Sequence, residues 1–298
     1  MKDRNRPKTN HILSQMDKQN TSTDKEVRNA IRKVVVSLMD RVMDKVLVND
    51  PFIPERHHAS KPLYAALVPD EIFKGSHFER RFVTPFGNAW ERLAVEVGKV
   101  YHGDCRQGYS VEGTVGEESL RRIQEVLNAI EHGAKGQQHS VPCWEKELEY
   151  IKDGGGKPLP VSVVCDILIH SGVTGKRLAF ELKGPLPNSD QTKVSKEKMF
   201  KLLAMNEHPI DNAYYALPYN PYGKRENYQW PFANRWFDMK KDESVLIGDE
   251  LWNLLGGNGT YRMFVDEMNQ LGSEYKERIY RDYLGIEPPQ GFDKTTLK

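Results

Sequence analysis

The chain has 298 residues, of which 38% are hydrophobic and 29% are charged, and its formal net charge is +1. This composition is typical of a soluble globular protein with one large domain or two small ones. The near-neutral charge gives little information about a nucleic-acid partner, because a basic patch can exist in a neutral protein. No apolar run approaches the roughly 20 residues that span a membrane, and no hydrophobic signal core is present, so we expect neither a membrane anchor nor secretion.

The number and spacing of the cysteines indicate the redox compartment of the protein and whether a zinc site is expected. Cys105, Cys143 and Cys165 are odd in number and show no Cys-x-x-Cys spacing. This pattern is typical of a reduced, cytoplasmic protein. His102 with two of these cysteines has no convincingly spaced fourth ligand, so the sequence does not favour a zinc site.

The N-terminal part of the chain predicts an arm followed by a helix. Residues 1–22 are polar and mildly basic, and we expect them to form a flexible arm. Thr23-Asp-Lys-Glu26 matches a capping box. Apolar residues then recur at helical spacing and predict an amphipathic helix over 23–48, which Asn49-Asp-Pro51 ends. Its apolar stripe is either core or a subunit interface.

The following elements are predicted from periodicity and turn residues. Residues 51–86 show no clear period, so we expect an irregular segment there. Helical spacing predicts helices over 88–97 and 117–131 and a short helix over 144–150. A strand is expected near 109–113, between glycines.

A pair of short apolar strands, residues 161–170 and 177–183, carries the most informative pattern. A glycine-containing turn joins them, which is a hairpin signal. Asp166 interrupts the first strand, and Glu181 and Lys183 close the second. Alternate residues of a strand share a face, so Glu181 and Lys183 point the same way. In the simplest register, Asp166 lies beside them on the neighbouring strand.

This arrangement predicts a chemistry. Two facing carboxylates, Asp166 and Glu181, need a cation, and oxygen ligands suit a hard ion such as Mg²⁺, which keeps several waters. A phosphate oxygen and a water can then take the open positions. Lys183 can orient or deprotonate that water and offset the charge on the phosphorane, which is metal-assisted phosphodiester hydrolysis. An ordinary hairpin with a structural aspartate and a Glu–Lys ion pair accounts for the motif equally well.

The hairpin resembles the PD-(D/E)xK nuclease superfamily, with Asp166 as the first acid and Glu181-Leu-Lys183 as the E-x-K element. Cys165 stands where the superfamily usually has proline, which is not a ligand. The resemblance implies an α/β fold with a mixed central sheet flanked by helices. It also implies an acid on the helix before the active-site strands. Glu91 is our candidate for this auxiliary catalytic and metal-binding acid, with Glu96 as a solvent-facing alternative.

After the hairpin, prolines end the strand and Gln191 opens a helix. We expect Gln191 to order the edge of the active site. The first turns carry Lys193, Lys196 and Lys198, a composition suited to phosphate contacts, and we predict DNA contacts for the first two. A buried strand over 212–217 completes the mixed α/β layer.

The C-terminal part predicts DNA recognition. Residues 219–237 interleave aromatic residues with Lys224, Arg225 and Arg235, which we expect to contact DNA. Packing as a small satellite core is an equal alternative for Trp230 and Phe232 of this loop. A long amphipathic helix is predicted over 261–283.

Several blocks narrow the resemblance, over about residues 27 to 280, to the TdeIII family of type II restriction endonucleases. They are Leu67 to Thr84, Glu181 to Lys198, Tyr219-Asn-Pro-Tyr-Gly223, Asp249-Glu-Leu-Trp-Asn253 and Gly256-Gly-Asn-Gly259. The resemblance implies a Mg²⁺-dependent prokaryotic enzyme that cuts double-stranded DNA, with GGNCC as the family's associated site and a DNA methyltransferase as its functional companion. A symmetric site read by one type of chain implies a homodimer.

We therefore predict the flexible arm over 1–22 and a single nuclease domain over 23–298. Its catalytic core lies at about 85–218, and elements for DNA recognition or dimerisation lie at about 219–285. Two alternatives stay open: a repair or recombination nuclease of the same fold, and a non-catalytic DNA-binding protein with a decayed site. The intact acidic and lysine residues of the hairpin argue against the second.

Overall fold

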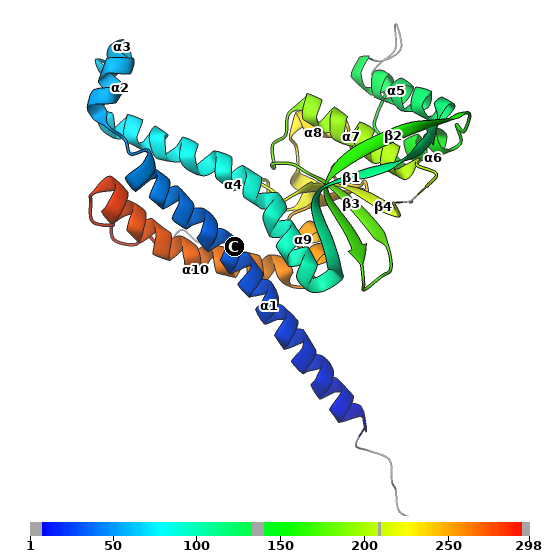
Figure 1. Ribbon diagram of the computed structural model, residues 1–298, viewed down its shortest axis with the longest axis horizontal. Helices are drawn as coiled ribbons and strands as arrows, with labels where there is room; N and C mark the ends of the chain where they lie inside the picture. Colours follow the sequence, from blue (N-terminus) through cyan, green and yellow to red (C-terminus); the bar gives the residue numbers. More distant parts are fainter. Residues whose placement is uncertain (1–7, 133–139, 208–209, 294–298) are drawn as a thin grey trace, which may run out of the picture. The chain divides into compact units, whose positions relative to one another are not determined.

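The computed structural model describes residues 8–132, 140–207 and 210–293, with side chains from residue 22 onward. Contacts divide the chain into two compact units, which are Met1–Leu93 with Arg262–Lys298 and Ala94–Tyr261 (Figure 1). The first is called unit 1 and the second unit 2. The prediction of a single domain over 23–298 does not anticipate this division. No helix within the described ranges is both long and apolar enough to cross a membrane.

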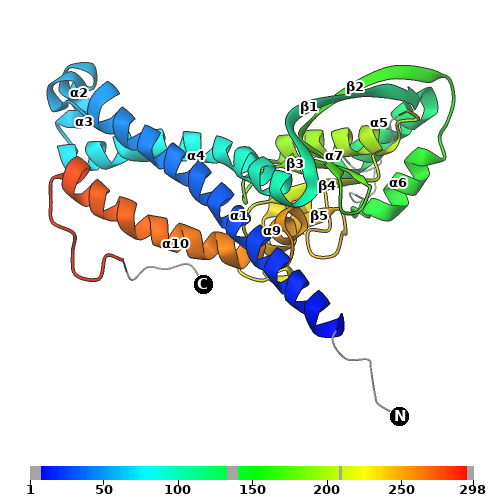
Figure 2. The ribbon, with the colours of Figure 1, turned by 60° about the horizontal axis from the view of Figure 1, so that its bottom comes forward.

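Unit 1 is built from helices. α1 and α10 lie side by side (Figure 2). Between them, Arg28 and Arg32 of α1 form ion pairs with Glu267 of α10 at 3.3 and 3.2 Å. The elements that contribute to unit 1 are α1 (Lys8–Asp44), the π-helix η1 (Lys45–Asn49), α2 (Pro54–Ser60), α3 (Pro62–Ala65), the first part of α4 (Asp70–His102), most of α10 (Thr260–Arg278) and the π-helix η3 (Ile279–Leu284).

The first helix is longer than its sequence predicts. α1 begins at Lys8, so the predicted start at Thr23 is wrong, and residues 8–22 of the expected arm belong to the helix. Residues 1–7 of that arm lie outside the described residues. The predicted apolar stripe is buried within the single chain, where Leu38 and Val42 pack against Ala89 of α4. Its interpretation as core is therefore confirmed.

α4 replaces much of the segment expected to be irregular. It begins at Asp70 and continues through Pro85, although an internal proline removes a helical hydrogen bond. Phe78, Phe82 and Phe86 recur at i, i+4 spacing, which places them on one face of a helix. Their neighbouring ring centroids are 6.2 and 5.1 Å apart. The prediction of an irregular segment over 51–86 is wrong because this aromatic packing outweighs the local effect of Pro85.

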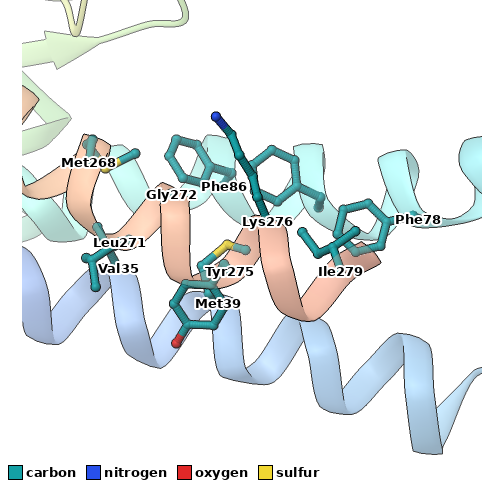
Figure 3. Close-up of a pocket in the computed structure, with 11 residues that line it drawn as sticks. Val35, Met39, Phe78, Phe86, Met268, Leu271, Gly272, Tyr275, Lys276 and Ile279 are labelled. Atoms are coloured by element: carbon teal, nitrogen blue, oxygen red, sulfur yellow. The ribbon is translucent and has the colours of Figure 1, made fainter. Parts of the chain in front are cut away.

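The helices of unit 1 enclose an apolar groove. Figure 3 shows the side chains that line it, including Val35 and Met39 of α1, Phe78 of α4, and Leu271 and Tyr275 of α10. The groove has a volume of about 290 Å³. The contact between these three helices is therefore apolar and incompletely filled along one side.

Unit 2 contains a mixed five-stranded sheet in the order β1-β2-β3-β4-β5. The strands β1 to β3 are antiparallel, and β3, β4 and β5 run parallel. Their bounds are β1 (Gly103–Gly116), β2 (Pro158–Ser171), β3 (Arg177–Leu182), β4 (Asn212–Leu217) and β5 (Val245–Ile247). The predicted mixed sheet is confirmed, and β5 is an addition that the sequence pattern did not indicate.

Helices flank this sheet, as predicted. α7 packs against β2, β3 and β4, and α5 packs against both α6 and α7 (Figure 1). Large apolar and aromatic side chains from these helices and strands, such as Ile123, Phe200 and Tyr215, form the core between them. The helices of unit 2 are α5 (Glu117–His132), α6 (Trp144–Lys152), α7 (Ser189–Leu203), α8 (Pro231–Asn234), α9 (Asp249–Gly256), the short 3-10 helix η2 (Arg225–Asn227) and the last turns of α4.

Candidate active site

The hairpin of β2 and β3 brings the predicted residues together. The ladder of these strands ends with Ile167 opposite Phe180, and Asp166 and Glu181 are the residues next to this last pair. Beyond this point the two strands no longer pair. The backbone N–H of Leu182 donates instead to the Oδ2 atom of Asp166 at 2.8 Å. The Asp166 carboxylate therefore accepts the hydrogen bond of a backbone N–H group that has no partner in the ladder, and this contact holds the carboxylate in place.

Lys183 lies at the centre of the site. Its ammonium donates to Asp166 Oδ2 at 2.7 Å, to the carbonyl oxygen of Leu182 at 3.2 Å, and to Glu181 Oε2 at 3.4 Å. These contacts are possible because Lys183 directly follows β3 and lies two residues after Glu181, so in an extended chain the two side chains point the same way. The expected neighbourhood of Asp166, Glu181 and Lys183 is thus present in the structure.

The protonation equilibria of the site follow from burial and charge. Burial of Glu181, which is 1% exposed, raises the pKa of its carboxyl, and the nearby Asp166 raises it further. Lys183 and Lys198 act in the opposite direction without cancelling the increase. Burial alone lowers the pKa of Lys183, but the two carboxylates outweigh burial and raise it overall. Lys183 is accordingly a hydrogen-bond donor in this state.

A second lysine completes the site and was not among the predicted catalytic residues. Lys198 of α7 donates to both oxygens of Glu181, at 2.9 and 3.1 Å. Ser195, one helical turn earlier, donates to Glu181 Oε2 at 3.3 Å. The sequence places Ser195 and Lys198 on one helix face through their i, i+3 spacing. It does not indicate that this face meets the carboxylate, because that depends on how α7 packs on the sheet.

The oxygen atoms of the site fit a hard cation. Asp166, Glu181 and the Leu182 carbonyl each direct one oxygen toward a single positive charge, the ammonium of Lys183. Oxygen donors of this kind suit Mg²⁺, which is commonly held by one or two carboxylates and several waters. Within the described residues, no group of three or more His, Cys, Asp or Glu side chains has metal-binding geometry. A metal here would therefore need carbonyl and water oxygens in addition to the two carboxylates.

The chain segment after Lys183 is held by aromatic residues of the loop 219–237. The Tyr228 hydroxyl donates to the carbonyl of Pro185 at 2.9 Å, and the Trp230 indole donates to the carbonyl of Pro187 at 2.7 Å. Tyr228 is fully buried. Of the two residues for which packing was the alternative, Trp230 packs against the protein, whereas Phe232 is 46% exposed. Sequence reasoning missed this support, because the partners are far apart in the chain.

Removing the Tyr228 hydroxyl tests this support. Tyr228→Phe is expected to lower the free energy of unfolding by about 1–2 kcal/mol, because the carbonyl of the half-buried Pro185 loses its donor. Urea unfolding measures the change. Tyr64→Phe is the control, because Tyr64 is 62% exposed and its replacement should have little effect. Equal stability of the two variants would contradict a structural role for the Tyr228 hydroxyl.

Two lysines of α7 were predicted to contact DNA. Lys196 is fully buried and forms an ion pair with Glu147 at 2.6 Å, so the prediction that it binds DNA is wrong. Lys193 is half-buried and forms an ion pair with Glu131. The two lysines differ because Lys196 is enclosed by Glu147, Trp236 and Phe237, whereas Lys193 pairs with the partly exposed Glu131.

The basic residues of the loop 219–237 also differ from one another. Arg225 donates to Glu250 at 2.8 Å and to two backbone carbonyls, so its guanidinium is bound internally rather than presented to DNA as predicted. Lys224 and Arg235 are exposed. Lys224 also lines a polar cavity of about 360 Å³ together with Asp249. Lys224 is therefore the member of the adjacent basic pair that faces solvent.

The remaining predicted residues have defined places on their helices. Gln191 is exposed in the first turn of α7, and its backbone N–H donates to the Asn188 side chain, the N-cap, at 2.8 Å. Glu91 lies on α4 within unit 1. The catalytic roles proposed for Gln191 and Glu91 stay predictions.

The known proteins that the chain resembles are type II restriction enzymes. The family model described as "Type II restriction endonuclease, HinfI" matches residues 27–272. The type II restriction enzymes HgiEI and HgiBI of Herpetosiphon aurantiacus are 26% and 25% identical to the chain over 235 residues, covering 75% of the chain and 81% of each enzyme. HgiCII of the same organism is 25% identical over 227 residues, covering 75% and 82%. The expected restriction endonuclease is thus confirmed, whereas the particular likeness to TdeIII stays a prediction. The chain belongs to the HinfI family of type II restriction endonucleases.

Proposed function

We propose that this restriction endonuclease hydrolyses double-stranded DNA with Mg²⁺ held by Asp166 and Glu181. The observation that supports the metal is the convergence of three oxygen atoms, from Asp166, Glu181 and Leu182, on the Lys183 ammonium. When bound there, Mg²⁺ would lower the pKa of a water ligand and stabilise charge on the phosphate. The fold supplies the ligands from two paired strands, which keeps their spacing fixed.

The protein residues then have distinct roles. Lys183 orients the attacking water and offsets the negative charge that develops on the phosphorane. Asp166 is kept in place by the Leu182 N–H, so its carboxylate does not need to reorganise during the reaction. Glu91 is our candidate for an auxiliary acid, and Gln191 orders the edge of the site.

The proposed DNA contacts and partners rest on the predicted basic residues and on the resemblance. Lys193, Lys224 and Arg235 contact DNA phosphates or bases. We propose a homodimer, because a two-fold protein matches a palindromic site. A GGNCC-type site rests on the resemblance to the TdeIII family. A companion DNA methyltransferase protects the host DNA, and both proteins act in the prokaryotic cytoplasm.

Digestion of a plasmid of known sequence tests the proposal. With Mg²⁺ we expect discrete fragments whose ends all map to one short motif, and with EDTA we expect no fragments. A plasmid from which every GGNCC sequence has been removed is the control for specificity. Cleavage of that plasmid into discrete fragments would contradict the GGNCC assignment.

Two other outcomes would contradict the broader proposal. Nicking that follows DNA structure, such as branches or single-stranded gaps, would favour a repair nuclease. Full cleavage after removal of divalent cations would contradict the metal assignment at Asp166 and Glu181.

A further inference from the structure

The Lys198 ammonium contacts both carboxylate oxygens of Glu181, which are atoms that a bound metal ion would also contact. Its ammonium lies 2.9 Å from one carboxylate oxygen and 3.1 Å from the other, so it is bidentate on Glu181. The carboxylate is 1% exposed and Lys198 is 29% exposed, so one partner is buried while the other reaches solvent. A ligand that approaches from solvent can therefore contact Lys198, whereas Glu181 lies behind it.

The formal charges of the site cancel. Asp166 and Glu181 carry two negative charges, and Lys183 and Lys198 carry two positive charges, and each ammonium contacts a carboxylate oxygen within 3 Å. A divalent cation entering this set meets two ammonium groups that repel it as well as two carboxylates that attract it. Such repulsion is strong at short range in a partly buried site. Metal binding by the free protein is thus opposed by both lysines: Lys183 contacts one oxygen of each carboxylate, and Lys198 contacts both oxygens of Glu181.

A DNA phosphate changes this balance. It brings negative charge to the site and is a good hydrogen-bond acceptor for an exposed ammonium. If the Lys198 ammonium moves from Glu181 to a phosphate oxygen, the carboxylate becomes available to the metal. The side chain of lysine is long and flexible, and Lys198 is one of the more exposed members of the set, so this exchange requires no change in the backbone.

We propose that Lys198 is a positioning residue that makes metal binding depend on DNA, by exchanging its ammonium between Glu181 and a DNA phosphate. This inference rests on the proposed function of the site. Because coupling between two ligands is reciprocal, metal also tightens DNA binding by the same factor. The free enzyme consequently holds the metal weakly and assembles the complete site on DNA.

Lys198→Met tests the exchange, because it removes the ammonium and keeps an unbranched side chain. Isothermal titration of Mg²⁺ into the full-length protein without DNA is expected to show at least about tenfold tighter binding than in the wild type. The dissociation constant of a duplex that lacks the cleavage site is measured by fluorescence anisotropy with and without Mg²⁺ at constant ionic strength. The factor by which Mg²⁺ tightens DNA binding is the dissociation constant without Mg²⁺ divided by the one with Mg²⁺. We expect this factor to be at least about tenfold smaller in the variant than in the wild type.

The same helix provides a matched control. Lys201 is also 29% exposed and forms an ion pair with Glu197 at 2.6 Å, one turn beyond Lys198. Lys201→Met removes a comparable charge without contacting the site, so both measurements should match the wild type. Lys198→Arg keeps the positive charge and should retain most of the coupling. Lys198→Gln replaces Lys198→Met if circular dichroism shows that the methionine variant is unfolded.

The outcomes separate this inference from the proposed function. Equal Mg²⁺ affinity and equal coupling in the wild type and in both uncharged Lys198 variants would overturn the exchange, even if the wild type cleaves DNA with Mg²⁺. Weaker Mg²⁺ binding in those variants would also overturn it, since Lys198 would then only orient Glu181. Absence of Mg²⁺-dependent cleavage by the wild type would instead overturn the proposed function.

Discussion

Replacing Lys183 with alanine is expected to lower the rate of Mg²⁺-dependent DNA cleavage by about 10³-fold. The side chain contacts Asp166, Glu181 and the Leu182 carbonyl, which places its charge where the attacking water and the phosphorane would lie. A positioned group that transfers or orients a proton typically contributes 10²–10⁴-fold to a rate. Single-turnover cleavage of a plasmid measures the chemical step without the contribution of product release.

Binding of DNA should survive the same substitution. Lys183 is one charge among several proposed DNA contacts, so we expect less than about a tenfold loss of duplex affinity in EDTA. Asp166→Ala should likewise abolish cleavage and keep binding. Lys201→Ala is the control, because its partner is Glu197 and not a residue of the site. Cleavage at the wild-type rate by Lys183→Ala would mean that the catalytic assignment of the hairpin is wrong.

The second large effect concerns stability. Lys196→Ala is expected to lower the free energy of unfolding by about 3–5 kcal/mol, because it leaves the Glu147 carboxylate without its buried partner. The Lys196 ammonium also donates to the carbonyl of Trp236 at 2.5 Å and lies 5.0 Å from the ring centroid of Phe237. Burial lowers the pKa of Lys196, whereas the charge of Glu147 acts in the opposite direction. Urea unfolding followed by circular dichroism measures the loss.

Two further variants show whether the loss of stability in Lys196→Ala comes from the unpaired Glu147 charge or from the loss of a lysine side chain in general. Lys193→Ala removes a half-buried lysine from the same helix, and we expect a change of about 1 kcal/mol or less. The double variant Lys196→Met with Glu147→Leu removes both charges and should recover most of the stability, as is often found for buried ion pairs replaced by apolar residues. A Lys196→Ala protein as stable as the wild type would contradict the role of the buried pair.

The central hairpin could be predicted because its information is local. Strand alternation places Glu181 and Lys183 on one face, and the short turn before them fixes the register that brings in Asp166. The helix α7 shows where local information ends. Its sequence gives three lysines in its first turns, but packing on the sheet decides that Lys196 is buried and that Lys198 meets Glu181. For Lys196 that decision depends on Glu147 of α6 and on Trp236, which are distant in the sequence.

The ends of the helices also show that local sequence information is not enough to predict the structure. Thr23 carries a good capping pattern, yet α1 passes through it, because a helix needs no cap where its backbone hydrogen bonds continue. Pro85 suggests an end, yet α4 continues because Phe78, Phe82 and Phe86 pack along one face. The i, i+4 recurrence of these phenylalanines was visible in the sequence and would have favoured a helix over an irregular segment.

The hydrogen bonds from Tyr228 and Trp230 to the segment after the catalytic strand have a consequence for enzyme engineering. A chimera that takes residues 219–237 from a relative with another specificity would also exchange the donors that hold Pro185 and Pro187. Such a chimera would lose activity through displacement of Lys183, and the loss would be mistaken for failed recognition. Transplanting residues 185–189 together with the loop would keep the two halves of this contact matched.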